Sequence, residues 1–217
     1  MSPNAEDHRG AEPFLPARRT ITALAHAVPD CRGCDLYREA TQAVFGAGTP
    51  DATLVLVGEQ PGDAEDREGH PFVGPAGRIL DQALEESGIA RDAVWLTNAV
   101  KHFRFTQRGK RRMHEGPSRW HVAACHPWLL AELDAVKPRG VVTLGATAGQ
   151  SLFGSGFRVG ASRGKVLDPP EGRREWVVAT IHPSAVLRGR DRRDELYAGL
   201  VADLGVALDA LGSPSRS

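Results

Sequence analysis

The sequence predicts an α/β fold, a three-layer α/β/α sandwich with a central, mainly parallel four-stranded sheet. Short apolar runs rich in β-branched residues, such as Leu54-Val55-Leu56-Val57, alternate along the chain with longer segments of helical periodicity. Continuous apolar runs are typical of strands buried on both faces. Their alternation with helices builds a mainly parallel sheet covered by helices.

The expected elements follow one another in a regular order. Strands are expected at 54–57, 94–98, 141–144 and 176–180, with an edge strand near 165–167, and helices at 21–28, 77–87, 118–136, 146–153 and 193–211. The helix from Ser118 has the clearest start, because serine is a favoured N-cap and an apolar stripe follows at helical spacing. We expect residues 1–19 to be a disordered polar leader, 20–212 one domain and 213–217 a flexible tail.

Composition places the chain among ordinary globular proteins. Its 217 residues are 41% hydrophobic and 25% charged. No apolar run approaches the roughly 20 residues that a membrane span needs, and the N-terminal segment lacks the apolar core of a signal peptide. We therefore expect a cytoplasmic monomer that does not associate with membranes.

Basic residues cluster at two places although the formal charge balances at 27 basic and 27 acidic residues. The first cluster comprises Lys101, Arg104, Arg108, Lys110, Arg111 and Arg112, and the second comprises Arg188, Arg190, Arg192 and Arg193. Two basic patches on a neutral body indicate a localised phosphate-binding face. Either patch alone is equally consistent with solvated surface charge.

A loop rich in glycine and proline follows the first strand. Seven glycines and prolines lie between residues 61 and 77, so neither helix nor strand is expected there until residue 77. Open α/β sheets bind ligands beyond the carboxyl ends of their strands. This loop carries Glu59, Gln60, Asp63 and Phe72, and we interpret it as one wall of a pocket. The alternative is an Ω-loop without chemistry.

Three cysteines indicate a metal or cluster site. Cys31 and Cys34 form a CxxC, and Cys125 lies far downstream on an expected helix. An odd number of cysteines argues against a disulfide framework, and a CxxC with a distant third thiol is a partial metal site. Spacing alone leaves a structural zinc, an iron–sulfur cluster, a redox CxxC and buried inert thiols open. A histidine would complete the ligand set, with His102 as the first candidate and His121 and His126 as competitors.

Three further polar residues lie at strand ends or in a basic loop. Asn98 ends the strand at 94–98 and His182 follows the strand at 176–180, so both belong to the same sheet edge as Glu59. His114 follows three cations in the loop from 104 to 117. Each also has a generic interpretation: a cap or turn for Asn98, a structural histidine for His182 and solvated surface for His114.

These motifs together resemble the uracil-DNA glycosylase superfamily. GEQPG with Asp63, PFVGPAG, TNAVKH, the distant third cysteine and HPS occur in the family's order, and the resemblance covers nearly everything from Cys31 to Leu211. The iron–sulfur family-4 branch is the most similar. The insert containing KRRMH resembles the loop that distinguishes its UdgX group. Histidine at position 102, where other family-4 proteins have cysteine, agrees with that group, whereas Met113 replaces the isoleucine of the group's loop.

The resemblance implies a role for each motif. The catalytic residues would be Glu59, Gln60, Asp63, His114 and His182; uracil would contact Gln60, Phe72, Asn98 and His182; DNA would contact Arg108, Lys110, Arg111, Arg112, Ser184 and Arg188. A 4Fe-4S cluster with a structural role would be held by Cys31, Cys34, His102 and Cys125. The implied partner is uracil-containing DNA, either single-stranded or with the uracil flipped out of a duplex.

The implied activity is excision of uracil from DNA in base-excision repair, followed by capture of the protein on its product. In the UdgX group the histidine that matches His114 bonds to the deoxyribose C1′ of the abasic site, which would consume the enzyme in one turnover. Two alternatives stay open. One is an ordinary multiple-turnover glycosylase in which His114 only contacts DNA, and the other is a non-catalytic iron–sulfur module that binds DNA.

Overall fold

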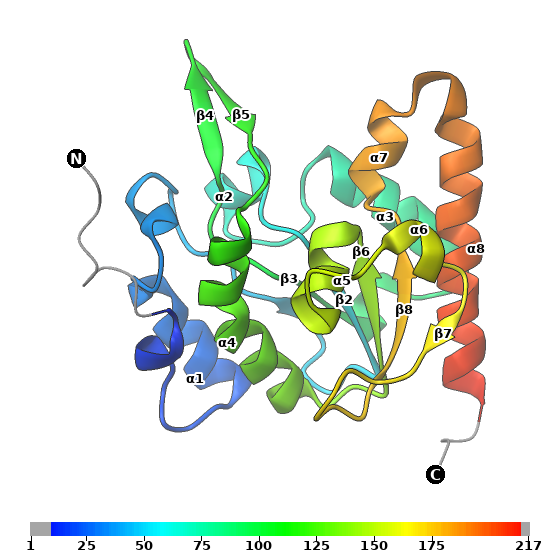
Figure 1. The fold of residues 1–217 in the computed structure, drawn as a ribbon, viewed down its shortest axis with the longest axis horizontal. Helices are drawn as coiled ribbons and strands as arrows, with labels where there is room; N and C mark the ends of the chain where they lie inside the picture. Colours follow the sequence, from blue (N-terminus) through cyan, green and yellow to red (C-terminus); the bar gives the residue numbers. More distant parts are fainter. Residues whose placement is uncertain (1–9, 214–217) are drawn as a thin grey trace.

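A six-stranded sheet forms the centre of the described part of the chain (Figure 1). The structure is a computed structural model that describes residues 10–213. The strand order is β1-β3-β2-β6-β8-β7, with bounds β1 Ala47–Gly48, β2 Leu54–Gly58, β3 Val94–Asn98, β6 Gly140–Leu144, β7 Val166–Leu167 and β8 Trp176–Thr180. The four central strands run parallel and the two short edge strands antiparallel. The mainly parallel sheet is confirmed, with β7 near its expected place and β1 as an unexpected edge strand.

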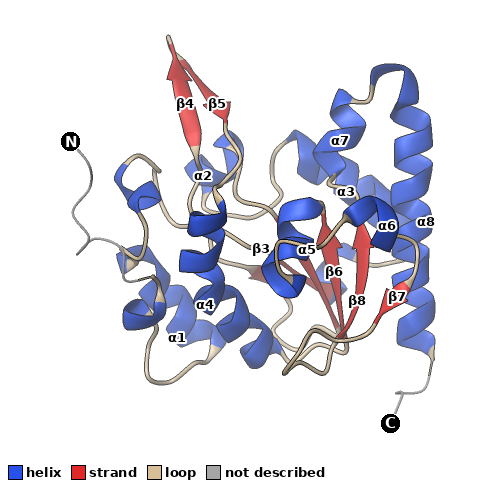
Figure 2. Ribbon diagram, viewed as in Figure 1, coloured by secondary structure: helices blue, strands red, loops and turns tan. Residues whose placement is uncertain are grey.

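Helices cover both faces of the sheet (Figure 2). Their bounds are α1 Ile21–Ala27, α2 Asp63–Glu68, α3 Pro75–Glu86, α4 Arg119–Val136, α5 Ala146–Phe153, α6 Val159–Ser162, α7 Pro183–Arg188 and α8 Arg193–Gly212. Side chains of β2 alternate between the faces, as in any strand. Leu54 and Leu56 pack with α3 and α8, whereas Val55 and Val57 pack with α4. None of the helices between residues 10 and 213 is long and apolar enough to cross a membrane.

The N-terminal segment packs on α4 beside the sheet. Ala11 is buried, and its amide donates a hydrogen bond to Ala124 O at 2.8 Å. Leu24 of α1 is buried in the same apolar cluster as Trp128 of α4. Of the leader expected at 1–19, residues 1–9 lie outside the described residues, but the structured body already includes residues 10–19. The expected tail lies outside the described residues from 214 on.

A buried ion pair joins β3 to α4. Lys101 and Glu132 are both fully buried, and the Lys101 ammonium contacts the Glu132 carboxylate. The ammonium also donates to Thr97 Oγ1 and to Asn98 O, each at 2.7 Å, and Trp95 Nε1 donates to the other Glu132 oxygen at 3.0 Å. A buried charge is tolerated when it is paired and hydrogen-bonded in this way. The network fixes the carboxyl end of β3 and with it the main chain of Asn98.

The glycine- and proline-rich loop contains the short helix α2, so the expectation of no helix before residue 77 is wrong. Glu65 explains why it forms: one carboxylate oxygen accepts from the Gly62 amide at 3.0 Å and the other from the Gly74 amide at 2.9 Å. The first contact satisfies an amide at the start of the helix, and the second ties the helix to the end of the loop. The many glycines and prolines around it predicted a loop, although residues 63–68 contain neither.

The basic loop is a β-hairpin rather than an irregular segment. β4 Phe105–Arg108 and β5 Arg111–His114 pair antiparallel around the two-residue turn Gly109-Lys110. Gly109 has φ 57°, and glycine at the first turn position is the signature of a type II′ hairpin. Apart from Phe105 and Arg112, its side chains are exposed, so the strands lack the alternation of apolar and polar residues that sequence reasoning uses.

Candidate active site

The candidate residues gather at the carboxyl edge of the parallel strands. β2 pairs with β3 on one side and with β6 on the other, so the direction of strand addition reverses at β2, where open α/β sheets bind ligands. Glu59 follows β2, Asn98 ends β3 and His182 lies just beyond β8. The parallel register therefore brings together residues that are far apart in the sequence.

Asn98, Phe72 and His182 lie together at this edge as a candidate recognition group. A Cβ atom at Gly58 would clash with Asn98 Oδ1 and lie 2.6 Å from Phe72 Cζ, so a glycine there lets both side chains approach. The Phe72 and His182 rings are stacked at 6.3 Å between centroids with 27° between their planes. Phe72 has φ 57°, a left-handed conformation that is rare outside glycine and concentrates at functional sites. One amide and two flat rings suit a planar heterocycle.

His182 has a defined protonation state. Its Nδ1 accepts from the Ser184 amide at 3.1 Å, so the neutral ring carries its proton on Nε2. Burial, helped by the charges of Arg188 and His114, lowers the pKa of His182 to about 4. At pH 7 the residue is therefore a neutral hydrogen-bond donor. Ser184, expected to contact DNA, places its hydroxyl 2.8 Å from the same Nδ1 and so orients the histidine.

His114 lies beside Glu59 and Gln60. Its Nε2 is 3.6 Å from Glu59 Oε1 and 3.1 Å from Gln60 Nε2. The two protons of the Gln60 amide nitrogen already have carbonyl partners, so this contact does not fix which nitrogen of His114 carries the ring proton. The His114 side chain is 50% exposed, so it lies at the surface of the site. A neutral imidazole with an available lone pair is a competent nucleophile.

Gln60 holds the base of the hairpin. Its amide nitrogen donates to Arg104 O and Glu115 O, both at 3.1 Å, and its Oε1 accepts from the Arg104 amide at 3.1 Å. Two carbonyl partners on one side and an amide on the other assign the orientation of the Gln60 amide. Gln60 is buried, and its bonds engage both ends of its amide with the segment that carries His114.

Arg112 anchors the hairpin to the loop that contains α2. Its guanidinium bonds Asp63 at 2.5 Å and Asp66 at 2.6 Å, and it lies over the Phe105 ring at 5.0 Å. Only 11% of the Arg112 side chain is exposed. Arg112 was expected to contact DNA, but its side chain faces two carboxylates and not solvent. Asp66, which sequence reasoning missed, is fully buried and also accepts from the Thr41 amide.

This anchor decides where His114 points. Side chains alternate along a strand, so Arg112 and His114 lie on the same side of β5. Burial opposes ionisation of Asp63, but hydrogen bonds from Arg67 and Arg112 outweigh it and lower the pKa of Asp63. Asp63, expected to be catalytic, is thus an ionised partner of Arg112, and the pair turns His114 toward the body of the protein.

Thr147 joins the site although its sequence position was not singled out. It is the second residue of α5, and its hydroxyl donates to Glu59 Oε2. The signal that could have found it is the one that found Asn98 and His182, because β6 ends at Leu144 on the same sheet edge.

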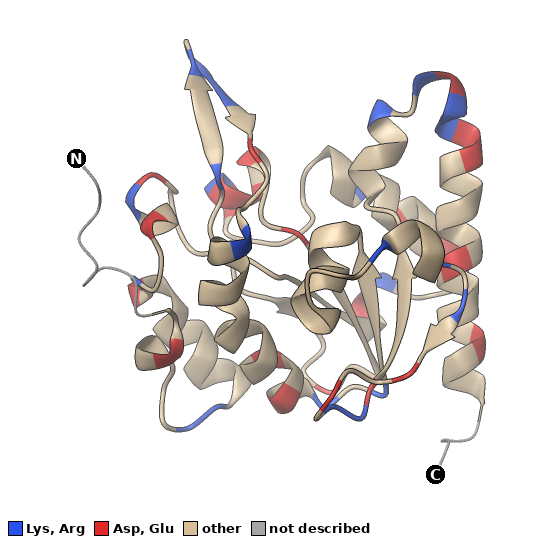
Figure 3. Ribbon diagram, in the orientation of Figure 1, with Lys and Arg blue, Asp and Glu red and all other residues tan. Residues whose placement is uncertain are grey.

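Exposed cations flank the site on two projections. Figure 3 shows Lys and Arg on the hairpin and on the connection between α7 and α8, both beyond the carboxyl edge of the sheet. Arg108, Lys110 and Arg111 are exposed on the hairpin, and Arg188 is exposed at the end of α7. Positive charge on both sides of the site suits a polyanionic strand that crosses it.

The three cysteines are free, buried and close to one another. Cys31, Cys34 and Cys125 belong to one cluster of buried side chains. Burial raises the pKa of Cys34 to about 11 and that of Cys125 to about 12, with the other thiols adding to the effect. Trp128 Nε1 donates to Cys31 Sγ at 3.2 Å and the Lys101 amide to Cys125 Sγ at 3.3 Å. Such donors fit thiolate ligands of a positively charged group.

His102 is the histidine that suits this cysteine cluster. It is buried, and Arg32 within the CxxC is near enough to affect it. Burial, followed by the Arg32 charge, lowers the pKa of His102 to about 4, so its neutral imidazole is available as a ligand. His121 is engaged instead with Asp35 at 2.9 Å. Burial lowers the pKa of His126, and the charge of Arg173 adds to this effect.

The cysteines do not converge on a single ion. Among residues 10–213, no group of three or more His, Cys, Asp and Glu side chains is arranged to hold one metal ion. A mononuclear zinc site needs four ligands within about 2.0–2.3 Å of one centre. The side chains of residues 10–213 therefore do not form a mononuclear zinc site.

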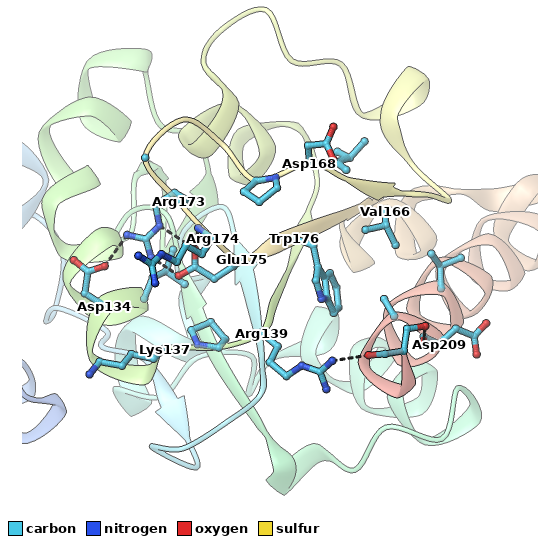
Figure 4. A pocket seen from close by; sticks show the side chains of 18 residues that line it. Asp134, Lys137, Arg139, Val166, Asp168, Arg173, Arg174, Glu175, Trp176 and Asp209 are labelled. Carbon is cyan, nitrogen blue, oxygen red and sulfur yellow. Dashed lines mark hydrogen bonds and ion pairs between the residues drawn. The ribbon is translucent and has the colours of Figure 1, made fainter. Parts of the chain in front are cut away.

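A cavity of about 990 Å³ lies at the opposite, amino edge of the sheet and is not part of the site (Figure 4). Two of the arginines that line it already have protein partners. Arg173 bonds Asp134 and Glu175, each at 2.6 Å, and Arg139 donates to Leu211 O at the end of α8. The cavity therefore stands apart from the candidate chemistry.

Comparison with known proteins identifies relatives over most of the chain. Residues 45–205 match the uracil DNA glycosylase superfamily. A type-4 uracil-DNA glycosylase from Thermotoga maritima is 38% identical over 77% of this chain and 83% of its own length. Proteins of the same name from Archaeoglobus fulgidus and Pyrobaculum aerophilum are 34% and 32% identical, over 81% and 90% of this chain and 87% and 99% of their own lengths.

The lowered pKa of His182 predicts a pH-dependent stability difference. As pH falls from 6.5 toward 4, the unfolded histidine binds a proton that the folded one refuses, so wild type loses stability relative to His182→Asn. The slope is at most about 1.4 kcal/mol per pH unit and vanishes once both states are protonated. Urea unfolding of both proteins at pH 7, 6 and 5 measures it. Parallel pH dependences would contradict the assignment of a neutral His182.

Proposed function

This chain belongs to the uracil-DNA glycosylase superfamily and to its family-4-like branch, and we propose that it excises uracil from DNA and then stays bonded to the abasic deoxyribose through His114. One observation carries the covalent part of the proposal. His114 Nε2 lies 3.6 Å from the Glu59 carboxylate on a hairpin that Arg112 anchors. An imidazole nitrogen held beside a carboxylate at the ligand-binding edge of the sheet supports capture of a cationic sugar.

DNA would enter between the two basic projections. Arg108, Lys110, Arg111 and Arg188 would neutralise phosphates, which makes the first encounter salt-dependent. Uracil inside a duplex must be flipped out at a cost of a few kcal/mol, and less in a single strand. Stacking of uracil on Phe72 would offset about 1–3 kcal/mol of this flipping cost.

Uracil recognition would rest on Asn98. Its amide offers one donor and one acceptor, which match the O4 acceptor and N3–H donor of uracil, whereas cytosine presents the reverse pattern. Asn98 is 3% exposed and its main chain is fixed by Lys101. A mispaired hydrogen bond at a site shielded from water is costly, so cytosine is rejected.

Bond cleavage would separate charge that two residues stabilise. The electron pair of the C1′–N1 bond leaves with uracil, and His182 Nε2–H donates to the O2 atom where negative charge develops. One preorganised donor of this kind contributes about 2.7–4 kcal/mol. Glu59 would stabilise the positive charge that develops at C1′.

The covalent step would follow from proximity. The Nε2 lone pair of His114 forms a bond to C1′ as the bond to uracil breaks, and the alkylated ring then loses its Nδ1 proton. Uracil leaves as its anion and takes up a proton from solvent. A positioned nucleophile has a large advantage over bulk water. After the Nδ1 proton is lost, reversal would have to expel an imidazolate anion, which is a poor leaving group, so the enzyme is consumed.

We also propose that Cys31, Cys34, Cys125 and His102 hold a 4Fe-4S cluster. The support is the cluster of buried thiols with donors at two sulfurs and a neutral buried histidine nearby. When bound, the cluster would join the N-terminal segment and the start of the hairpin to α4. Its contribution would be structural, because none of these ligands belongs to the recognition group of Asn98, Phe72 and His182.

A multiple-turnover glycosylase is the second candidate. The relatives named type-4 uracil-DNA glycosylases favour it, and in that case His114 would contact DNA without bonding to it. Both candidates share Asn98, Phe72, Glu59 and His182, and they differ only in what attacks C1′.

The adduct should depend on His114. Wild type incubated with a uracil-containing oligonucleotide should give a protein–DNA band that survives boiling in denaturing electrophoresis, and His114→Ala should give none. His26→Ala, which changes an exposed histidine of α1, is the matched control and should form the adduct like wild type. An undiminished adduct in His114→Ala would refute the assignment of the nucleophile.

Neighbouring arginines of the hairpin should separate anchoring from DNA binding. Arg112→Met removes the anchor to Asp63 and Asp66, so adduct formation at saturating DNA should slow at least about tenfold, in line with a lost charged hydrogen bond. Arg111→Met removes an exposed cation, so it should weaken DNA affinity and reduce the salt slope by about one unit. Rates of adduct formation across DNA and salt concentrations test this. Equivalent behaviour of the two variants would argue against the anchor.

The metal proposal predicts iron and its spectrum. Protein purified without oxygen should be brown, with broad visible absorption from iron–thiolate charge transfer and with bound iron and sulfide. Cys125→Ser and His102→Ala should lose iron, whereas His121→Ala should retain it because His121 pairs with Asp35. Stoichiometric zinc in wild type, or iron lost from His121→Ala alone, would overturn the ligand set.

A further inference from the structure

We propose that Thr147 is a positioning residue that holds the Glu59 carboxylate in the orientation that faces His114. The inference rests on the proposed function of the site. The supporting observation is that one oxygen of the Glu59 carboxylate accepts a hydrogen bond from a hydroxyl group, while the other oxygen faces the His114 imidazole. Thr147 Oγ1 donates to Glu59 Oε2, and Glu59 Oε1 lies 3.6 Å from His114 Nε2.

The main chain of Glu59 is fixed, but its side chain needs a separate restraint. Glu59 O accepts from the Val100 amide at 3.0 Å, which ties the start of the loop to β3. The Glu59 side chain is 27% exposed, so open rotamers compete for it. Among residues 10–213, the Thr147 hydroxyl is the one group that donates a hydrogen bond to its carboxylate, and no lysine or arginine pairs with it.

The turn that carries Thr147 is itself well placed. Gly145 has φ 93°, a region that favours glycine, and its amide donates to Thr180 O at 2.9 Å. A Cβ at Gly145 would lie 3.0 Å from the Cβ of His182. The segment from Gly145 to Thr147 therefore packs against the expected leaving-group donor and restrains the expected charge stabiliser. Threonine is β-branched and stiff at χ1, so it holds its hydroxyl in few directions.

A charge can stabilise a cation at C1′ only if the carboxylate is there before reaction. Without the Thr147 hydroxyl, Glu59 would rotate into solvent for part of the time, and each such rotamer is unproductive. DNA affinity would be unaffected, because Thr147 lies at the sheet edge and not among the exposed cations. The loss would therefore appear in the rate of uracil release at saturating DNA and not in the affinity.

The test compares single-turnover uracil release and DNA affinity in Thr147→Val, Thr147→Ser and Ser151→Ala. Thr147→Val keeps the shape and removes the hydroxyl, so it should slow release about 10- to 100-fold with DNA affinity unchanged. Thr147→Ser restores the donor and should stay within about threefold of wild type, since only a methyl group is lost. Ser151→Ala removes a hydroxyl that bonds Ala148 O in the same helix and should have no effect.

A double variant shows whether Thr147 acts through Glu59. In a Glu59→Gln background the further change Thr147→Val should slow release by less than about threefold, because the group that it positions is already disabled. Wild-type rates in Thr147→Val, equal defects in Thr147→Val and Thr147→Ser, or full additivity in the double variant would each overturn the proposal. Scoring uracil release separately from the adduct keeps this test independent of the covalent step. Release without an adduct refutes capture by His114 and leaves the Thr147 comparison valid.

Discussion

The parallel register of the four central strands is the constraint on which the site depends. Gly58 pairs with Asn98, and Leu144 pairs with Thr180, so all four strands end at one edge. Asn98 ends β3, and Glu59, Thr147 and His182 follow the ends of β2, β6 and β8. A slip of any strand by one residue would turn its side chains to the other face and take its functional residue out of the group.

The hairpin adds a residue that the sheet edge alone does not supply. Its strands have little apolar surface of their own, and an isolated two-stranded hairpin is only marginally stable in water. Arg112, paired with Asp63 and Asp66 and packed over Phe105, compensates for this. Arg112 was predicted to contact DNA but instead orients the hairpin, whereas its neighbour Arg111 is exposed. Binding and orientation are divided between adjacent residues of one basic run.

The sequence predicted the sheet well because buried parallel strands and amphipathic helices have strong periodic signals. The strand at 94–98 and the helix at 146–153 have the expected bounds, and Ser118 caps α4 as expected, with its hydroxyl accepting from the His121 amide. It failed where stability comes from tertiary contacts. α2 depends on Glu65 reaching Gly62 and Gly74, and the hairpin depends on acids more than forty residues away. Neither contact has a local pattern.

The site was predicted in part for the same reason. Glu59, Asn98 and His182 follow apolar strands and could be placed at one edge, whereas the family resemblance alone suggested His114. Thr147 was missed because a threonine near a helix start is common and only the structure shows its partner. The family resemblance assigned Ser184 and Arg112 to DNA, whereas the structure shows a histidine as the partner of Ser184 and two carboxylates as the partners of Arg112.

The central claim is that an imidazole nitrogen reaches the anomeric carbon before water does. Peptide mass spectrometry of the digested reaction product tests it most directly, because it locates the modified residue. The account predicts a deoxyribose remnant on His114 in the peptide that contains Met113 and Glu115. Uracil released in full with that peptide unmodified, or with the sugar on another residue, would contradict it.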